Sequence, residues 1–340
     1  MARRGGMRMG LWAGMVAVAG LAMLCLAAYR GMIAVKPRVP RPALGPDTWE
    51  EIAALGDRLM EHVRALGGHI GERHLGRPEA LRAAAEYVRG AWTAQGFAVT
   101  EEAFQVAGRA CANLWVEQRG STRGEAVILV GAHYDSVPGS PGANDNGTGI
   151  ALLLEMSRAI KAQSLPRTVR FVAFVNEEPP YFQTEAMGSR IHAARARQRG
   201  DRIEAMISLE TLGYYADAPG SQRYPWPFGA FYPDAGNFLA VVGNLRSRGL
   251  VVGFLRHFMA ASDFPVEGVA TFERIPGIDW SDHWSFWQEG YPALMLTDTA
   301  PFRYPEYHSA DDLPDRINAP EFARAAHGII QAARRMAAAP

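Results

Sequence analysis

The 340-residue sequence contains only two cysteines, Cys25 and Cys111, and this scarcity excludes two kinds of protein. Cys25 lies within an N-terminal apolar run, so the pair does not supply a disulfide framework. Two thiols are also too few for a thiolate-rich zinc site. If the protein binds a metal ion, its ligands must therefore be histidine, aspartate and glutamate.

The sequence also lacks an excess of charge of either sign, because 35 Lys and Arg balance 35 Asp and Glu. This balance gives no indication of a nucleic-acid partner, and we predict none. GxSxG, HExxH and P-loop motifs are absent, so the chemistries that those motifs carry have no support here. There is no internal repeat.

One long apolar run is present, at the N-terminus. A basic tail, residues 1–8, precedes an uncharged segment, residues 9–29, which is long enough as a helix to cross the hydrocarbon core of a membrane. The segment is longer than the apolar part of a typical cleaved signal, and residues 25–27 make a poor cleavage site. We therefore predict an uncleaved transmembrane anchor, followed by a stiff, proline-rich linker over residues 30–46.

The basic residues on the two sides of this segment nearly balance, so charge alone does not orient it. A short basic N-terminus usually remains in the cytoplasm, and large domains cross largely regardless of charge. We therefore expect residues 47–340, the main folded domain, on the extracytoplasmic side (periplasmic or extracellular).

Beyond residue 46, helical and strand-like patterns alternate, which predicts one α/β domain with a largely parallel sheet. We expect strands over residues 98–106, 113–117, 127–130, 168–175, 203–209, 238–242, 269–272 and 293–296. We expect helices over residues 47–66, 78–95, 148–162, 187–198, 245–260 and 320–336.

Residues 127–149 organise the rest of the chain. Four apolar residues, 127–130, lead into His133 and Asp135, which therefore lie at the carboxyl end of a buried strand. Open α/β sheets bind their ligands at that end of their strands. Asp145 follows in a loop rich in Gly, Pro and Asn. Alone, this His and Asp pattern is as typical of a structural pair as of a site.

Three further strands end in the same way. Glu177 and Glu178 follow the strand 168–175, Glu210 follows the strand 203–209, and His308 lies beyond the strand 293–296. Adjacent carboxylates are costly to bury unless a cation compensates them. Because four strands deliver such groups to one edge of a sheet, we predict a metal site there.

The five candidate ligands are suited to zinc above other metals. They are too many for one catalytic zinc ion, but they suit two zinc ions if Asp145 bridges them. A pair of metals lowers the pKa of a shared water molecule, and Glu177 would then be the general base. The predicted ligands are His133, Asp145, Glu178, Glu210 and His308.

These motifs also resemble a known family, the co-catalytic di-zinc aminopeptidases (metallopeptidase family M twenty-eight). The similarity covers about residues 49–337, and its motifs occur in the family's order and spacing: GAHYDSVPGSPGANDNGTG, VNEE, ISLETLGY, SDHWSFWQEGYPALMLTD and YHSADD. It implies a single-domain, three-layer α/β/α fold with a mixed, mostly parallel sheet, as in zinc exopeptidases. It also implies release of N-terminal residues from peptides that have a free N-terminus.

Residue by residue, the resemblance implies that His133 and Glu210 bind one zinc ion, and that Glu178 and His308 bind the other. Asp145 would bridge the two ions, and Glu177 would be the base. Asp135 matches the carboxylate that orients the His133 ring, a role that the His-x-Asp spacing also suggests.

The sequence departs from the family pattern at two places. Glu210 stands where many members have Asp, and its longer side chain could hold a metal less tightly. The glycine that usually follows the acid pair is missing, so we expect a differently shaped loop and an independent substrate preference.

Two other functions remain open. One is a glutaminyl cyclase, which has similar motifs but uses a single zinc ion; the other is a non-catalytic, receptor-like ectodomain, which the intact ligand set disfavours. Asp282 and His283 either support the site or cap a helix, and Asp298 is expected to brace a turn. Seven aromatic residues either line a substrate pocket or cover the core: Tyr214, Tyr215, Tyr224, Trp226, Phe228, Phe231 and Tyr232.

Overall fold

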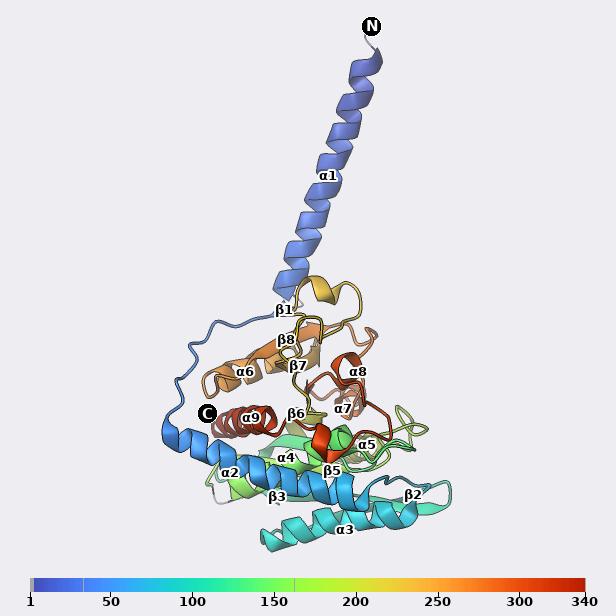
Figure 1. Cartoon of the computed structure of the whole chain (residues 1–340), viewed down its shortest axis with the longest axis vertical. Coiled ribbons are helices and arrows are strands. Elements are labelled where there is room, and N and C mark those ends of the chain that lie inside the picture. The colour runs from blue at the N-terminus through green and yellow to red at the C-terminus, as the bar shows by residue number, and fades with distance from the viewer. Residues whose placement is uncertain (1–2, 33, 162, 340) are drawn as a thin grey trace.

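A nine-stranded mixed sheet forms the centre of the protein, with the strand order β1-β8-β7-β9-β6-β4-β5-β3-β2 (Figure 1). A computed structural model describes residues 3–32, 34–161 and 163–339. Its strands are β1 (Ala34–Val35), β2 (Thr100–Val106), β3 (Arg109–Gln118), β4 (Arg123–His133), β5 (Arg167–Phe174), β6 (Arg202–Glu210), β7 (Leu239–Asn244), β8 (Val266–Thr271) and β9 (Ala293–Thr297).

Helices cover both faces of this sheet and make the predicted α/β/α layers. Along β4, Ile128 and Val130 pack into the core on the side of α2, α4 and α9, whereas Val127 and Leu129 pack on the side of α5 and α7. This alternation is the two-residue period of a strand buried on both faces. The helices are α2 (Pro46–Val63), α3 (Pro78–Ala94), α4 (Gly149–Lys161), α5 (Gly188–Arg199), α6 (Arg248–Met259), α7 (His283–Gln288), α8 (Ala300–Arg303) and α9 (Ala319–Ala338).

The sheet is less parallel than predicted. Strands β5, β4, β6 and β9 run parallel at its centre, but four of the eight strand pairings in the described chain are antiparallel. One cause is local, because only Ala107 and Gly108, both with positive φ, separate β2 from β3, and so short a turn permits only an antiparallel pair. The parallel centre is the part that matters for the site, because it directs the ends of β4, β5 and β6 to one edge.

The N-terminal region begins with α1 (Arg3–Met32), which projects from the domain (Figure 1). The transmembrane segment predicted over residues 9–29 falls on this helix. The side chains of residues 9–11 and 28–29 lie outside the described residues, and within the described part no helix has both the length and the apolarity to cross a bilayer.

Several residues of the predicted linker, residues 30–46, contact the domain. Ala34 and Val35 pair with β8 as an edge strand. The Arg41 Nη1 atom donates hydrogen bonds to the backbone carbonyls of Asp263, at 2.8 Å, and Phe264, at 3.2 Å. These parts of the linker therefore pack on the domain surface.

Candidate metal centre

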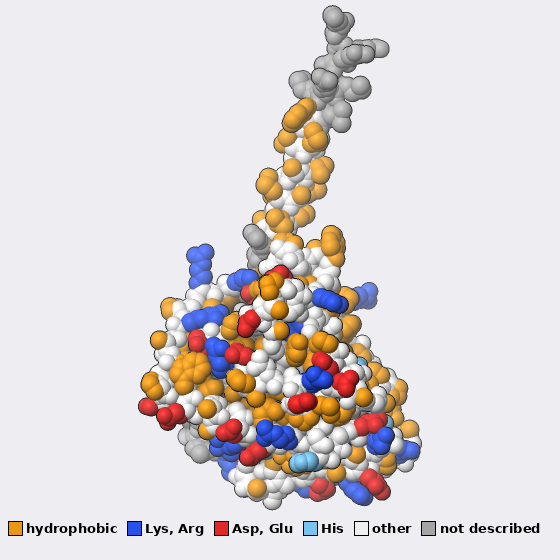
Figure 2. Space-filling view, viewed as in Figure 1, with side chains coloured by type: hydrophobic (Ala, Val, Ile, Leu, Met, Phe, Trp, Pro, Cys, Tyr) orange, Lys and Arg blue, Asp and Glu red, His pale blue; other side chains and the backbone are white. Residues whose placement is uncertain are grey.

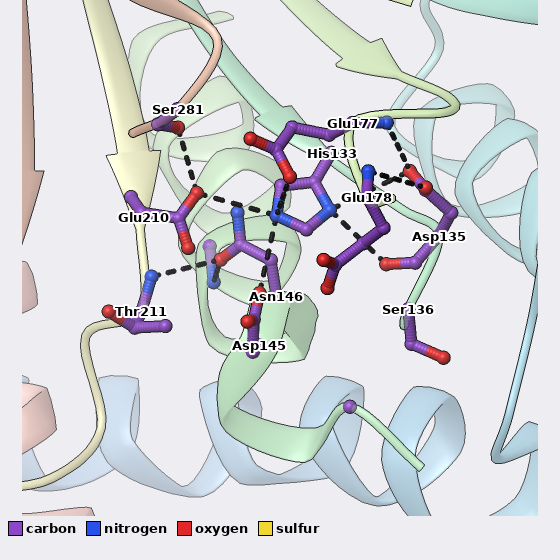
Figure 3. A network of polar contacts seen from close by, with 12 residues as sticks. His133, Asp135, Ser136, Asp145, Asn146, Glu177, Glu178, Glu210, Thr211 and Ser281 are labelled. Carbon is purple, nitrogen blue, oxygen red and sulfur yellow. Dashed lines mark hydrogen bonds and ion pairs between the residues drawn. The ribbon is translucent and has the colours of Figure 1, made fainter. Parts of the chain in front are cut away.

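The five predicted ligands converge at the carboxyl edge of the parallel strands. Figure 3 shows His133, Asp145, Glu178 and Glu210 there. They form two groups, and within each group one ligand atom from every residue lies within 4.8 Å of the others. The first group consists of His133, Asp145 and Glu210, and the second of Asp145, Glu178 and His308. Asp145 belongs to both groups.

In the first group, the His133 Nε2 atom lies 3.3 Å from Asp145 Oδ1 and 3.4 Å from Glu210 Oε2. In the second group, the His308 Nε2 atom lies 3.1 Å from Asp145 Oδ2 and 3.4 Å from Glu178 Oε2. Asp145 thus presents a different carboxylate oxygen to each histidine. A carboxylate that bridges two cations through both of its oxygens takes this arrangement.

The residues fit a pair of divalent cations on the basis of their unsatisfied atoms. His133 Nε2, Asp145 Oδ1 and Glu178 Oε1 are buried and make no hydrogen bond with any described residue. Buried polar atoms without partners are costly, and metal coordination is one way to satisfy them. Imidazole nitrogens and carboxylate oxygens are also the ligand types that zinc accepts.

The pKa values show the same excess of negative charge. Burial raises the pKa of Glu178 to about 7, with a further contribution from Asp145, and burial also raises the pKa values of Glu177 and Glu210. Burial would lower the pKa of His308, but its hydrogen bonds to Asp145 and Glu178 raise it to about 10. Without cations, burial thus favours the protonated forms of Glu177, Glu178 and Glu210, whereas, against the effect of burial, the histidines lower the pKa of Asp145, and bound cations would displace the protons.

Asp135 contacts both the acid pair and the His133 ring. Its carboxylate accepts hydrogen bonds from the backbone amides of Glu177, at 3.2 Å, and Glu178, at 3.3 Å (Figure 3). The His133 Nδ1 atom lies 3.6 Å from Asp135 Oδ1, but 3.2 Å from the Asp135 backbone carbonyl oxygen. The side chain of Asp135 therefore fixes the acid pair, and its backbone carbonyl is the closer partner of the ring.

Glu177 lies at the site but belongs to neither ligand group. Its Oε2 atom is 3.8 Å from His133 Nε2, and its side chain is buried. The adjacent Glu178 side chain lies in the second group, toward His308. The two neighbouring acids therefore have different surroundings, which leaves the Glu177 carboxylate available for proton transfer.

The loop that carries Asp145 is held by an acid to which the sequence analysis gave no role, Asp312. This buried carboxylate accepts hydrogen bonds from the amides of Asn144, at 2.8 Å, and Asp145, at 3.1 Å, and from the Tyr304 hydroxyl, at 2.9 Å. Asp312 is the last residue of the YHSADD motif, but a backbone amide as its partner leaves no signal in the sequence.

Asp298 braces a turn, as predicted, because its Oδ2 atom accepts hydrogen bonds from Asn144 Nδ2 and from the Tyr214 amide. Ser281, which was not predicted to contribute, donates a hydrogen bond of 2.7 Å to Glu210 Oε2.

Asp282 makes no side-chain capping bond to α7, and its two carboxylate oxygens lack hydrogen-bond partners among the described residues. His283 bonds the Ile278 carbonyl oxygen instead of the site.

A buried arginine, also not anticipated, shapes the loop before Asp145. Arg73 donates to the backbone carbonyls of Tyr134, at 2.7 Å, and Gly142, at 2.8 Å, and also contacts the Pro141 carbonyl. Because its guanidinium binds backbone oxygens, it leaves the carboxylates of the site without a direct arginine partner among these contacts. The whole arrangement is a candidate two-metal centre in an α/β fold.

Comparison with known proteins identifies the family. The model of Peptidase family M28 matches residues 113–333, and the chain belongs to this family. It is 38% identical over 284 residues to the Escherichia coli (strain K12) protein YfbL, a match that covers 81% of this chain and 86% of that protein. It is 54% identical over 110 residues to aminopeptidase YwaD of Bacillus subtilis (strain 168), which covers 29% of this chain and 23% of YwaD.

Solved structures share the fold at low sequence identity. The Legionella pneumophila LapA aminopeptidase superposes with a TM-score of 0.64 at 15% identity and covers 89% of this chain and 78% of its own. The glutaminyl cyclase of Fimbriiglobus ruber superposes with a TM-score of 0.61 at 20% identity and covers 88% of this chain and 99% of its own. The fold therefore accommodates both kinds of enzyme.

Proposed function

We propose that the protein is a zinc-dependent aminopeptidase that hydrolyses the N-terminal peptide bond of peptides. The observation that carries this proposal is the pair of ligand groups that share Asp145, with Glu177 beside them and outside both. Membership of Peptidase family M28 and the similarity to aminopeptidase YwaD support the same reaction class.

The ligands would divide as follows. His133 and Glu210 would hold one zinc ion, Glu178 and His308 would hold the other, and Asp145 would bridge them. When bound, the two ions supply Lewis acidity toward the scissile carbonyl and lower the pKa of the attacking water.

The chain's own residues would move the proton and hold the geometry. The Glu177 carboxylate would accept a proton from the attacking water and deliver it to the nitrogen of the leaving amine. Asp135 would keep Glu177 and Glu178 in place through their two amides. Ser281 would orient the Glu210 carboxylate by its hydrogen bond.

The proposal is tested by counting bound zinc in the purified protein while measuring hydrolysis of aminoacyl p-nitroanilides before and after chelation. We expect two zinc ions per chain and activity that returns when zinc is added back. Glu177→Gln should lower kcat at least about 100-fold and retain the bound zinc. The matched control is Glu185→Gln, because Glu185 is 88% exposed, and it should behave as wild type. Wild-type turnover by Glu177→Gln would exclude it as the base and would contradict the proposal.

Glutaminyl cyclisation is the second candidate, because glutaminyl cyclases share the fold. The completeness of both ligand groups favours the two-zinc peptidase instead. One bound zinc ion, with release of ammonia from N-terminal glutaminyl peptides and no hydrolysis of aminoacyl amides, would favour the cyclase.

We also propose that residues 9–29 anchor the domain on the extracytoplasmic side of a membrane. The lack of charge in this segment supports the proposal, as do large apolar side chains on α1 that stand exposed, such as Leu21, at 64%, and Leu24, at 71% (Figure 2). The full chain should remain with membranes after carbonate extraction, and added protease should reach the domain in spheroplasts. Release of the full chain by carbonate would refute the anchor.

A further inference from the structure

A largely apolar cavity of about 110 Å³ opens beside the metal centre. One end is formed by Glu210, a proposed ligand, and by Tyr307, which stacks on His308 with ring centroids 3.8 Å apart. Aromatic rings supply much of the remaining wall, including Phe228, Phe238 and Trp280. This volume is somewhat smaller than the roughly 150 Å³ of an apolar cavity that holds benzene. Because the cavity is open at its mouth, it has room for one leucine-sized or phenyl-sized side chain that enters there.

The aromatic residues between Tyr214 and Tyr232 divide between the two roles expected for them, lining a pocket and covering the core. Tyr224, Phe228 and Tyr232 line the cavity. Tyr215, in contrast, packs against Phe264 in the core with ring centroids 5.1 Å apart, and Trp226 is 93% exposed. The stretch therefore both lines a pocket and covers the core.

A charged residue is set into this apolar wall, at the far side from the metal centre. Glu267 on β8 lines the cavity, and its position follows from the register of the sheet. Glu210 pairs with Thr297, Thr297 with Ala240, and Ala240 with Glu267, and all four residues line the cavity. Three strand spacings separate the backbones of Glu210 and Glu267 by about 14 Å, which a lysine side chain and a glutamate side chain can span end to end.

The Glu267 carboxylate is neutralised from outside the catalytic domain. The Lys36 Nζ atom lies 3.0 Å from Glu267 Oε2, and among the described residues Lys36 is the one cation within ion-pair distance of it. Lys36 follows β1, which pairs with β8 beside Glu267, so the edge strand positions the lysine (Figure 1). The same ammonium lies 5.5 Å from the centroid of the Tyr232 ring, which also lines the cavity.

We propose that Lys36 determines the substrate preference by masking Glu267, so that the pocket accepts peptides with a large, uncharged, apolar N-terminal residue. This inference rests on the aminopeptidase function proposed above. A carboxylate without a partner in an apolar wall attracts a cation, because its burial is otherwise costly. Lys36 supplies that cation from the linker, and a lysyl or arginyl side chain of a substrate therefore finds no free partner there.

Removing the Lys36 ammonium should shift the preference for the N-terminal residue of the substrate toward basic residues. In Lys36→Met, Glu267 remains and a substrate ammonium or guanidinium can take the place of Lys36. We expect the ratio of kcat/KM for lysyl or arginyl p-nitroanilide to that for phenylalanyl p-nitroanilide to rise at least tenfold. Lys36 is 53% exposed, and pairs at such exposed sites contribute little to stability, so the variant should fold normally.

Three further variants identify the cause. Lys36→Met combined with Glu267→Gln should lose the gain, because the carboxylate that attracts the basic side chain is removed. Glu267→Gln alone should retain the apolar preference. The matched control is Lys161→Met, because Lys161 also lies over an aromatic ring, that of Phe97, at 4.0 Å, but that ring, unlike that of Tyr232, does not line the cavity. It should leave the ratio unchanged.

Binding to the Glu177→Gln protein, measured by calorimetry with phenylalaninamide and lysinamide, tests the pocket without turnover. Lys36→Met in that background should tighten lysinamide binding at least tenfold relative to phenylalaninamide. If both the ratio of kcat/KM and the ratio of binding constants stay within twofold of wild type, the inference is overturned. Loss of hydrolysis of every amide, with the expected change in binding, would instead refute the proposed reaction and leave the pocket assignment supported.

Discussion

Replacing Asp312 with asparagine should weaken the metal centre without changing any proposed ligand. The Asp312 carboxylate holds the bridging loop through the amides of Asn144 and Asp145. Asparagine keeps one acceptor oxygen but turns an NH₂ group toward the other amide, so one hydrogen bond is replaced by two facing donors.

The expected magnitude follows from the bonds that are lost. A hydrogen bond to a charged group contributes about 1.5–3 kcal/mol, and the remaining bond loses the assistance of the charge. We therefore expect a cost of about 2–3 kcal/mol to hold Asp145 in position. Since about 1.4 kcal/mol corresponds to a factor of ten, the population with Asp145 in position should fall roughly 30- to 140-fold.

The assay is zinc titration of the metal-free protein, followed by measurement of kcat/KM at limiting and at saturating zinc. Asp312→Asn should bind zinc more weakly and lose activity at limiting zinc, with partial recovery when zinc is raised. Tyr304→Phe is the matched control, because it removes the hydroxyl that donates to the same carboxylate at 2.9 Å but leaves both amide bonds to Asp312, and it should weaken zinc binding less than Asp312→Asn does. Zinc affinity and kcat/KM within twofold of wild type for Asp312→Asn would refute the role assigned to this residue.

Three other predictions follow from the structure. Chelation should lower Tm by about 5–10 °C if zinc binds only the folded chain, and an unchanged Tm on calorimetry would contradict this. Ser281→Ala should weaken zinc binding about tenfold by freeing the Glu210 carboxylate, whereas equal zinc affinity would show that the bond is dispensable. Burial opposes ionisation of Glu155, but its hydrogen bonds to His62, Arg158 and Arg58 lower its pKa to about 2. Its contribution to the free energy of unfolding, at most about 3 kcal/mol, is therefore present above about pH 4.5 and is lost as the pH falls toward 2. The free energy of unfolding of Glu155→Gln, measured by denaturant, should lack this pH dependence. The same pH dependence in both proteins would exclude Glu155 as its source.

The central strands could be predicted from the sequence, because burial on both faces produces a recognisable run of apolar residues. The apolar run before His133 and the run before Glu177 are buried on both faces, and both became parallel strands. Parallel strands that end at one edge bring their following residues together, so the meeting of His133, Glu178 and Glu210 could be predicted before any coordinates.

The edges of the sheet were harder to predict. Nothing in the two residues of β1 distinguishes them from the rest of a proline-rich linker, and their strand character comes from pairing with β8. The antiparallel pairing of β7 with β9 likewise depends on the path of the chain between them. An edge strand is stabilised by its neighbour more than by its own residues.

The sequence alone determined the class of fold and the side chains of the candidate metal centre, because short-range periodicity and residue chemistry carry that information. Only the tertiary structure determined which residues hold those side chains in place and which residue sets the substrate preference of the pocket. Asp312 acts on backbone amides about 170 positions away, and Lys36 acts on Glu267 from the opposite part of the chain. The register of the strands and the path of the chain determine which residues become such partners, and the pattern of residue types along the sequence does not reveal them.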